Sequence, residues 1–332
     1  MKTKIEFDSS VSELEKLVPR ETTVLVTDEH VFNHHQSLFG GWNTIVLKPG
    51  EAYKTQATVD SIISKLLEFE ADRSWTLVGV GGGVVTDITG YAAGVYMRGI
   101  RCGFIPTTIL AMVDASIGGK NGIDVGVYKN MVGLIRQPAF LLYDTDLLAS
   151  LPESEWINGM AEVIKHACIK DAAMFKTLEA SDLKELRKDK DLLKKLIRRN
   201  ALLKSKVVEA DEFEKGERKL LNFGHTLGHA IENMYELSHG QAVSIGMTVA
   251  CHLSERLTGF KHTDRVTKVL EQYGLPTYAT FDVEQAWEIL KMDKKRTTQA
   301  MNYILLEKIG QAVIQPIPLT ELQTLLAEFV QQ

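Results

Sequence analysis

Apolar and polar positions follow two different periods in the first half of the chain, which predicts strands and helices in turn. Short β-branched runs predict strands at 22–27, 43–48, 75–80, 101–106 and 139–143. Between them, 55–69 and 84–97 place apolar residues at helical spacing. This alternation is typical of a parallel sheet with helices on both faces.

The pattern changes after residue 150, where long helical repeats replace the strand signals. Helices are predicted at 153–170, 183–210, 220–237, 241–257, 262–273, 283–292 and 319–329. The segments 301–306 and 312–314 are compatible with a small hairpin. We therefore predict an α/β domain at 1–150 and a mainly helical domain at 151–332.

The composition is that of a globular protein and excludes several classes. Hydrophobic residues make up 45% and charged residues 24%, so disordered and collagen-like chains are excluded. A net charge of -5 argues against nucleic-acid binding through bulk positive charge. No apolar run approaches the roughly 18 residues of a membrane span. The three cysteines are widely spaced, and the N-terminus has no signal-peptide core, so we expect a cytoplasmic protein.

Glycine is unevenly distributed: 13 of the 25 lie between Gly79 and Gly133. A predicted strand running into 81–83 and then a helix is the outline of a dinucleotide phosphate site. The order GGGVVTD does not match GxGxxG, so a tight turn is the alternative. Asp28, which follows the first predicted strand, is either an acceptor for ribose hydroxyls or a helix cap.

A second block, 106–124, combines hydrogen-bonding side chains with groups for an anionic ligand. It contains Thr107, Thr108 and Asp114, and then Gly118, Gly119 and Lys120. Further basic residues stand beside these motifs: Arg98, Lys129, Lys165, Lys204, Arg218, Lys294 and Lys295. A lysine taken alone is usually a surface residue. Together with a nucleotide site, this many cations indicate a small polyanionic substrate.

Three of the nine histidines fall within 15 residues and predict a metal site. His225 and His229 are four residues apart and would share a helix face. Thr226 follows His225, so the HExxH motif of zinc proteases is excluded. His239 precedes the next predicted helix, and Glu162 is a carboxylate in an apolar stretch, where an unpaired charge is costly. Imidazoles with one carboxylate form a usual zinc set, although each histidine alone is more often structural.

These motifs together resemble the 3-dehydroquinate synthase family. The matching segments are 81–100 (GGGVVTDITGYAAGVYMRGI), 106–124 (PTTILAMVDASIGGKNGID), 129–133 (KNMVG), 159–166 (GMAEVIKH), 204–232, 239–247 (HGQAVSIGM) and 292–295 (MDKK). Residues 26–28 and 49–54 extend the resemblance weakly toward the N-terminus. His166 stands where a tyrosine is common in the family.

The resemblance implies an α/β plus α fold: an N-terminal Rossmann-like parallel-sheet domain, an all-helical C-terminal domain and an active site in the cleft. It implies conversion of 3-deoxy-D-arabino-heptulosonate 7-phosphate (DAHP) to 3-dehydroquinate and phosphate. Transient oxidation at C5 by NAD+ acidifies the C6 proton, so that phosphate can leave C7. Re-reduction and an intramolecular aldol step then close the ring. The implied cofactors are NAD+ and one divalent metal, Zn²⁺ or Co²⁺, in a homodimer without nucleic-acid or membrane partners.

The resemblance also assigns roles to individual residues. The implied metal ligands are Glu162, His225 and His239. The implied catalytic residues are His229, Lys165, Asn130, Arg98 and Lys120. The implied substrate-binding residues are Asp114, Lys204, Arg218, Asn222, Lys294 and Lys295, of which one of the last two contacts substrate. The implied NAD-binding residues are Asp28, Glu51, Lys54, Gly82, Gly83, Asp87, Thr107, Thr108 and Lys129.

Three alternatives remain at this point. Another sugar phosphate cyclase would share fold, metal and NAD but close a different ring. A metal-dependent alcohol or glycerol-phosphate dehydrogenase would consume NAD(H) stoichiometrically. A binding module with a vestigial site would have lost metal ligands or cations, yet all of them are present.

Overall fold

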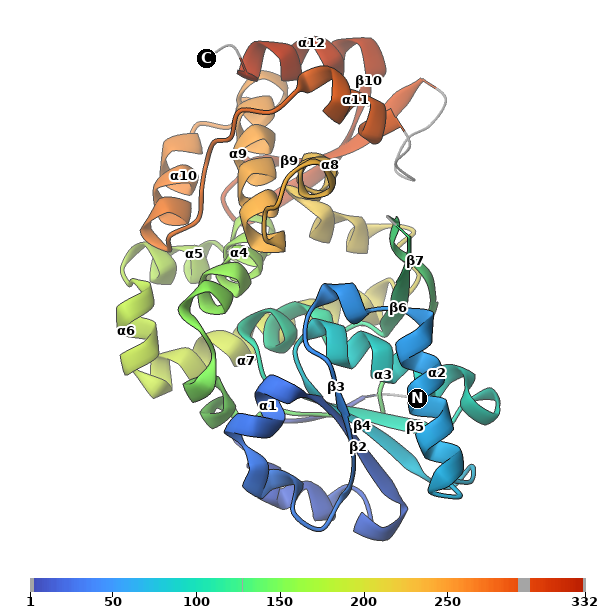
Figure 1. Ribbon diagram of the computed structural model, residues 1–332. Helices are drawn as coiled ribbons and strands as arrows, with labels where there is room; N and C mark the ends of the chain where they lie inside the picture. Colours follow the sequence, from blue (N-terminus) through green and yellow to red (C-terminus); the bar gives the residue numbers. More distant parts are fainter. Residues whose placement is uncertain (1–2, 127, 292–298, 331–332) are drawn as a thin grey trace. The chain divides into compact units, whose positions relative to one another are not determined.

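The computed structural model describes residues 3–126, 128–291 and 299–330, which form two compact units (Figure 1). The N-terminal unit comprises Met1–Trp156 and Ile197–Ser205, and the C-terminal unit comprises Ile157–Leu196 and Lys206–Gln332. Among the described residues, no helix has the length and apolar character needed to cross a membrane.

The N-terminal unit is built on a six-stranded sheet in the order β1-β8-β5-β4-β2-β3. Its strands are β1 (Lys4–Glu6), β2 (Thr23–Asp28), β3 (Asn43–Leu47), β4 (Thr76–Gly81), β5 (Arg101–Pro106) and β8 (Phe140–Leu142). Every neighbouring pair is parallel, with Val26 of β2 opposite Ile45 on one side and Gly79 on the other. The predicted parallel sheet is thus confirmed. The short edge strand β1 was not predicted.

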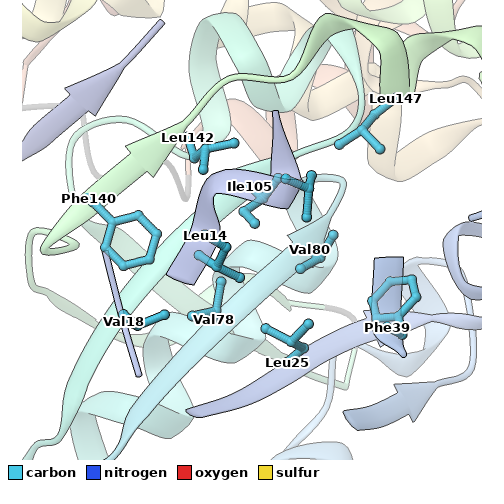
Figure 2. Close-up of a cluster of buried hydrophobic side chains, with 11 residues drawn as sticks. Leu14, Val18, Leu25, Phe39, Val78, Val80, Ile105, Phe140, Leu142 and Leu147 are labelled. Atoms are coloured by element: carbon cyan, nitrogen blue, oxygen red, sulfur yellow. The ribbon is translucent and has the colours of Figure 1, made fainter. Parts of the chain in front are cut away.

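Alternate residues of the central strands pack on opposite faces of this sheet. Val78 and Val80 join a buried cluster with Leu25 and Ile105 on one face (Figure 2). Gly79, between them in the sequence, lies on the other face, where a Cβ would come within 3.0 Å of Thr89. This glycine lets helix α3 (Gly83–Val95) approach the sheet closely.

The crossover helices of this unit are α1 (Glu29–His34), α2 (Gln56–Glu68) and α3. An antiparallel hairpin of β6 (Lys120–Val125) and β7 (Tyr128–Ile135) was not predicted. Its pairing places Gly122 opposite Gly133, and a Cβ on Gly133 would lie 2.4 Å from Asn121 O. Glycine at these positions permits close backbone approach but removes the β-branched alternation by which strands are recognised.

The sheet has a topological switch point between β2 and β4. The chain leaves β2 for β3 on one side, and leaves β4 for β5 on the other. Open parallel sheets bind ligands at such a point, beyond the carboxyl ends of the two strands. Asp28 and Gly81 end these strands.

The C-terminal unit is mainly helical. Its helices are α4 (Glu153–Lys170, which begins in the N-terminal unit), α5 (Ala172–Glu179), α6 (Leu183–Lys188), α7 (Lys190–Ala210, shared with the N-terminal unit), α8 (His225–Met234), α9 (His239–Leu257), α10 (Thr263–Gln272), α11 (Val283–Lys291) and α12 (Leu319–Val330). An antiparallel hairpin, β9 (Ala300–Lys308) with β10 (Gln311–Pro318), accompanies them. The expected hairpin is confirmed, and the implied all-helical domain is corrected to helices plus one small sheet.

Two predicted helices are each divided into two elements. The segment 183–210 breaks at Asp189, whose side chain accepts hydrogen bonds from Asp191 N and Leu192 N at the start of α7. The segment 220–237 is a 3₁₀-helix, η8 (Glu217–Asn222), followed by α8. Gly224 between them has φ +79°. Each break changes the backbone over a few residues only. The helical spacing of apolar residues in the sequence therefore continues from one element into the next.

Candidate nucleotide and metal sites

The turn from β4 leads into the N-terminus of α3, an arrangement that suits an anion. Gly82 occupies the N-cap of α3, and because it has no side chain it leaves the first N–H groups of the helix available. A Cβ on Gly82 would approach Thr108 Cγ2 at 3.1 Å, and one on Gly83 would approach Ala115 Cβ at 3.2 Å. The turn is therefore closely surrounded by the protein, and it presents backbone amides and a positive helix dipole end.

Thr107 and Thr108 follow β5, next to this turn. Thr107 N donates to Gly81 O at 3.0 Å, and Thr108 Oγ1 accepts from Ala111 N at 3.0 Å. Asp28 caps α1, because its Oδ1 accepts from Val31 N at 2.9 Å. The helix-cap interpretation is thus confirmed for this oxygen. A carboxylate has further acceptor capacity, so ribose binding by Asp28 stays a prediction.

A buried lysine connects three segments near the turn between β4 and α3. Lys54 Nζ lies 2.6 Å from Asp87 Oδ2 on α3 and 2.6 Å from Asn130 Oδ1 on β7. Asp124 joins the same network: its N–H donates to Lys54 O at 2.8 Å, and its Oδ1 accepts from Asn130 N at 2.7 Å. The β6–β7 hairpin is thereby tied to the loop that carries Lys54, in an arrangement that sequence analysis did not foresee for Asp124.

The charges in this network shift one another's pKa values. Burial raises the pKa of Asp87 to about 6, although Lys54 beside it acts in the opposite direction. Burial lowers the pKa of Lys54, but Asp87, Glu51 and Asp124 outweigh this effect and raise it overall. Glu51, on the 3₁₀ turn η4 (Glu51–Tyr53), therefore acts on the lysine electrostatically. The network holds a lysine cation beside a carboxyl group that titrates near neutrality.

Lys204 and Asp114 form a second ion pair in the N-terminal unit. Lys204 Nζ lies 2.7 Å from Asp114 Oδ1 and donates to Asp114 O, also at 2.7 Å. Asp114 belongs to a π-helical turn, Ala111–Ala115. Such turns are rare and concentrate at functional sites. The structure thus brings together two residues that were predicted separately.

The remaining predicted cations of this unit are exposed: Arg98, Lys120 and Lys129. Arg98 has φ +65° and Asn130 has φ +52°, a conformation that non-glycine residues seldom adopt. Strained backbone of this kind is found preferentially at functional positions.

Three helices of the C-terminal unit bring the predicted metal ligands together. Glu162 on α4 is fully buried, and its Oε1 lies 3.4 Å from His225 Nε2 and 3.5 Å from His239 Nε2. His225 is the first residue of α8 and His239 the first of α9. The three side chains offer ligand atoms that all lie within 4.8 Å of one another. A buried carboxylate facing two imidazole nitrogens fits a divalent metal.

Both histidines also bind a protein group through their second nitrogen. His225 Nδ1 lies 3.2 Å from Phe223 O, and His239 Nδ1 lies 3.4 Å from Glu232 Oε2. Burial lowers the pKa of His239, but Glu162 and Glu232 outweigh it and raise the pKa to about 9. With this raised pKa, both ring nitrogens of His239 carry a proton at neutral pH. A metal that binds at Nε2 has to displace the proton there.

Lys165 and His166 stand beside the cluster on α4. Lys165 Nζ forms an ion pair with Glu162 Oε2, and both side chains are almost completely buried. His166 Nε2 lies 4.0 Å from the same oxygen. Glu162 is therefore compensated by a cation, as a buried carboxylate requires. His229, the third histidine, is exposed, and its ring lies 5.1 Å from that of His225 and 6.3 Å from that of His239.

Close helix packing places these residues. A Cβ on Gly246 of α9 would lie 1.9 Å from Gly224 O, and one on Gly228 of α8 would lie 3.1 Å from Ala242 O. Asn158, one turn before Glu162 on α4, accepts a hydrogen bond from Gly240 N at 2.6 Å through its Oδ1. The start of α9, with His239, is thus fixed against both α8 and α4 (Figure 1).

Arg218 and Asn222 lie on η8, immediately before α8. The Arg218 side chain is buried and donates from Nη1 to Glu212 O at 2.5 Å. Asp211 organises the preceding turn, because its carboxylate accepts from the N–H groups of Lys215, Gly216 and Arg218. The predicted substrate residues Lys294 and Lys295 lie outside the described residues.

Comparison with known proteins identifies the family. A model of the 3-dehydroquinate synthase N-terminal domain matches residues 44–158, and one of the C-terminal domain matches residues 159–296. The chain belongs to the 3-dehydroquinate synthase family. Family members named 3-dehydroquinate synthase include one from Pyrococcus abyssi, 42% identical over 82% of this chain and 81% of its own. Another, from Thermodesulfovibrio yellowstonii, is 41% identical over 81% of this chain and 77% of its own.

A solved structure resembles the whole fold. The 2-epi-5-epi-valiolone synthase of Streptomyces hygroscopicus, with NAD+ and Zn²⁺ bound, has a TM-score of 0.90 at 25% identity, covering 100% of this chain and 97% of that one. The resemblance inferred from the motifs is therefore confirmed for family and fold.

Two residues that support the candidate metal site were not predicted from the sequence. Asn158 and Glu232 were not singled out, although each carried a signal: Asn158 precedes Glu162 by four residues, and Glu232 follows His225 by seven. Residues at these spacings share a helix face. Which group each one would bind depends on a neighbouring helix and could not be derived from one helix alone.

Proposed function

We propose that this protein is a 3-dehydroquinate synthase that converts DAHP to 3-dehydroquinate and phosphate, with NAD+ and one divalent metal. The convergence of Glu162, His225 and His239 in a member of this family is the observation that carries the proposal. The relatives that are more than 40% identical over most of the chain carry this name.

NAD+ is proposed to bind at the switch point between β2 and β4. The amides of the 82–83 turn are suited to its pyrophosphate, and a Cβ added at Gly82 or Gly83 would crowd Thr108 or Ala115. Asp28 at the end of the neighbouring strand is assigned to the ribose, and Lys54 and Asp87 to orientation of the nucleotide. When bound, NAD+ accepts and returns a hydride.

The metal is assigned to Glu162, His225 and His239, as Zn²⁺ or Co²⁺. The donor set fits, because a buried carboxylate oxygen and two Nε2 atoms point toward one position. When bound, the metal supplies a Lewis acid for the substrate's hydroxyl and carbonyl oxygens. Three protein ligands leave coordination positions for substrate, which a catalytic site requires.

The substrate's phosphate and carboxylate are assigned to basic side chains. Lys165, Lys204 and Arg218 are almost completely buried, and each is already held by a partner: Glu162, Asp114 and Glu212 O. Holding cations in fixed positions reduces the ordering cost of binding an anion. Arg98, Lys120, Asn130, Asn222 and one of Lys294 and Lys295 complete the proposed set.

His229 is proposed to transfer protons to and from the substrate. It is exposed while its neighbour His225 is buried, so its ring is accessible to a substrate near the metal. A neutral imidazole accepts a proton at one ring nitrogen and donates one from the other, which suits proton transfer in both directions. We further propose that the enzyme works in the cytoplasm as a homodimer.

Substrate choice tests the proposal. The purified protein with NAD+ and Zn²⁺ should release phosphate from DAHP and form 3-dehydroquinate. Turnover of sedoheptulose 7-phosphate without turnover of DAHP would instead establish a different sugar phosphate cyclase. His239→Ala should lose both the metal and the activity. His252→Ala serves as the control, because His252 lies on the same helix with a 40% exposed side chain.

A further inference from the structure

The two histidines of the metal cluster are held by different kinds of group. The Nδ1 of His225 faces Phe223 O, a backbone carbonyl only two residues away. The Nδ1 of His239 faces the carboxylate of Glu232, which belongs to another helix. His225 is thus oriented by its own loop, whereas His239 depends on a side chain of α8.

Glu232 is well placed for this task. Its side chain is 8% exposed, and its Oε2 lies 3.4 Å from His239 Nδ1, while Glu162 Oε1 lies 3.5 Å from Nε2 of the same ring. The imidazole therefore stands between two carboxylates, one at each nitrogen. A carboxylate at Nδ1 accepts a proton there, which leaves the lone pair of Nε2 for a metal.

We propose that Glu232 is a positioning residue that fixes the tautomer and ring orientation of His239 and thereby increases the affinity for the divalent metal. The inference rests on the proposed metal centre. The ring of His239 can otherwise rotate about its Cβ–Cγ bond, and its side chain retains 28% exposure at the first residue of α9. Carboxylate partners of ligating histidines typically change metal affinity by about 10- to 100-fold.

The structure also offers a second ligand set that has to be distinguished. His229, Glu232 and His239 bring ligand atoms within 4.8 Å of one another. In that arrangement Glu232 would bind the metal directly. Glu162 would then be dispensable for metal binding, whereas in the proposed centre it is a ligand.

Zinc affinity of the full-length protein tests the inference without relying on activity. The metal is removed, and the dissociation constant for Zn²⁺ is measured by competition with a chromophoric chelator. Glu232→Ala should weaken binding by about 10- to 100-fold at unchanged one-to-one stoichiometry. Glu232→Gln, which retains an acceptor oxygen, should weaken it less. Glu236→Ala removes an exposed carboxylate three residues before His239 and should leave the affinity within twofold.

Other outcomes would contradict the inference in recognisable ways. Equal affinity of Glu232→Ala and wild type would exclude a positioning role. An equal loss in Glu232→Gln and Glu232→Ala, with an altered absorption spectrum of the Co²⁺ form, would make Glu232 a ligand. Wild-type affinity in Glu162→Gln would instead refute the proposed metal centre. Glu232→Gln also serves as the test if Glu232→Ala fails to fold.

Discussion

Asp87 combines the energetic cost of a buried carboxyl group with a place beside the proposed nucleotide site. Its carboxylate is paired with Lys54, yet burial still raises its pKa from 3.8 to about 6. The side chain retains 18% exposure. It belongs to α3, the helix that begins at the turn proposed to bind the nucleotide. A group held near neutrality in this way is typical of sites that bind or transform ligands.

This raised pKa predicts how stability depends on pH. Between pH values of about 4 and 6 the folded protein retains a proton that the unfolded chain has released, so stability falls as the pH rises through this window. Asn at this position does not titrate. From about pH 5 to 7, wild type should therefore lose about 1 kcal/mol of unfolding free energy relative to Asp87→Asn.

Urea unfolding of the two proteins at both pH values measures the difference. In Lys54→Met the window should move to higher pH, because the cation that opposes the shift is removed. A difference between wild type and Asp87→Asn that does not change with pH would show that Asp87 has an ordinary pKa.

At the scale of elements, the turn before η8 depends on one carboxylate. Asp211 accepts three backbone N–H bonds, and these lower its pKa although desolvation acts in the opposite direction. Its contribution to stability is thus present at neutral pH and lost as the pH falls through the lowered value.

Asp211→Ala should release the turn that precedes Arg218. Hydrogen exchange at the Gly216 and Arg218 amides should become about five- to tenfold faster, which is the effect of one net hydrogen bond. Mass spectrometry after exchange resolves this segment, and the α2 amides of the same sample are the control. Unchanged exchange at 216–218 would show that other contacts hold the turn.

The packing of α8 against α9 leads to a second prediction for an element. Alanine at Gly246 would place its Cβ 1.9 Å from Gly224 O, a backbone atom next to His225. The helices have to separate, so Gly246→Ala should destabilise the protein by about 1–3 kcal/mol, as overpacking does. Zinc affinity should fall with it, because His225 and His239 begin these two helices.

Gly40→Ala is the matched control for this substitution. There the added Cβ would meet only Ser37 O at 3.6 Å, an ordinary contact distance. Denaturant midpoints and chelator competition on both variants give the comparison. Wild-type stability and zinc affinity in Gly246→Ala would mean that α8 and α9 can separate without disturbing the cluster.

The same elements show what sequence could reveal about this fold. Strands β2, β4 and β5 are buried on both faces, so their apolar runs were unambiguous. The β6–β7 hairpin was missed because its exposed strand β7 and its paired glycines follow no apolar alternation. The break at Asp189 was missed because a cap interrupts the backbone but leaves the apolar period intact.

The residues of the candidate metal and nucleotide sites also divide into those that the sequence reveals and those that it does not. The proposed ligands Glu162, His225 and His239 can be predicted because histidines cluster in the sequence and a carboxylate stands in an apolar stretch. Glu232 and Asp124 were not, because their importance depends on partners in other elements. Sequence therefore identified groups with distinctive chemistry, and the fold was needed to identify those that orient them.

For the whole molecule, net charge describes the surface and not the binding groups. The chain carries -5 overall, yet the side chains of Lys165, Lys204 and Arg218 are buried. Buried cations are costly unless they are compensated, and ion pairs or carbonyl groups compensate all three. The net charge thus argues against nucleic-acid binding through bulk positive charge, but it gives no sign that the proposed substrate is an anion.

The proposed activity makes NAD+ a catalyst that is restored in every turnover. A dehydrogenase of similar architecture would instead convert one NAD+ for each product. The direct test is to supply DAHP and Zn²⁺ in large excess over NAD+, and to follow phosphate release and absorbance at 340 nm in one sample. Many phosphates released per NAD+, with no net accumulation of NADH, is the result that we expect. Release limited to one equivalent per NAD+, with a matching rise in absorbance, would contradict the account.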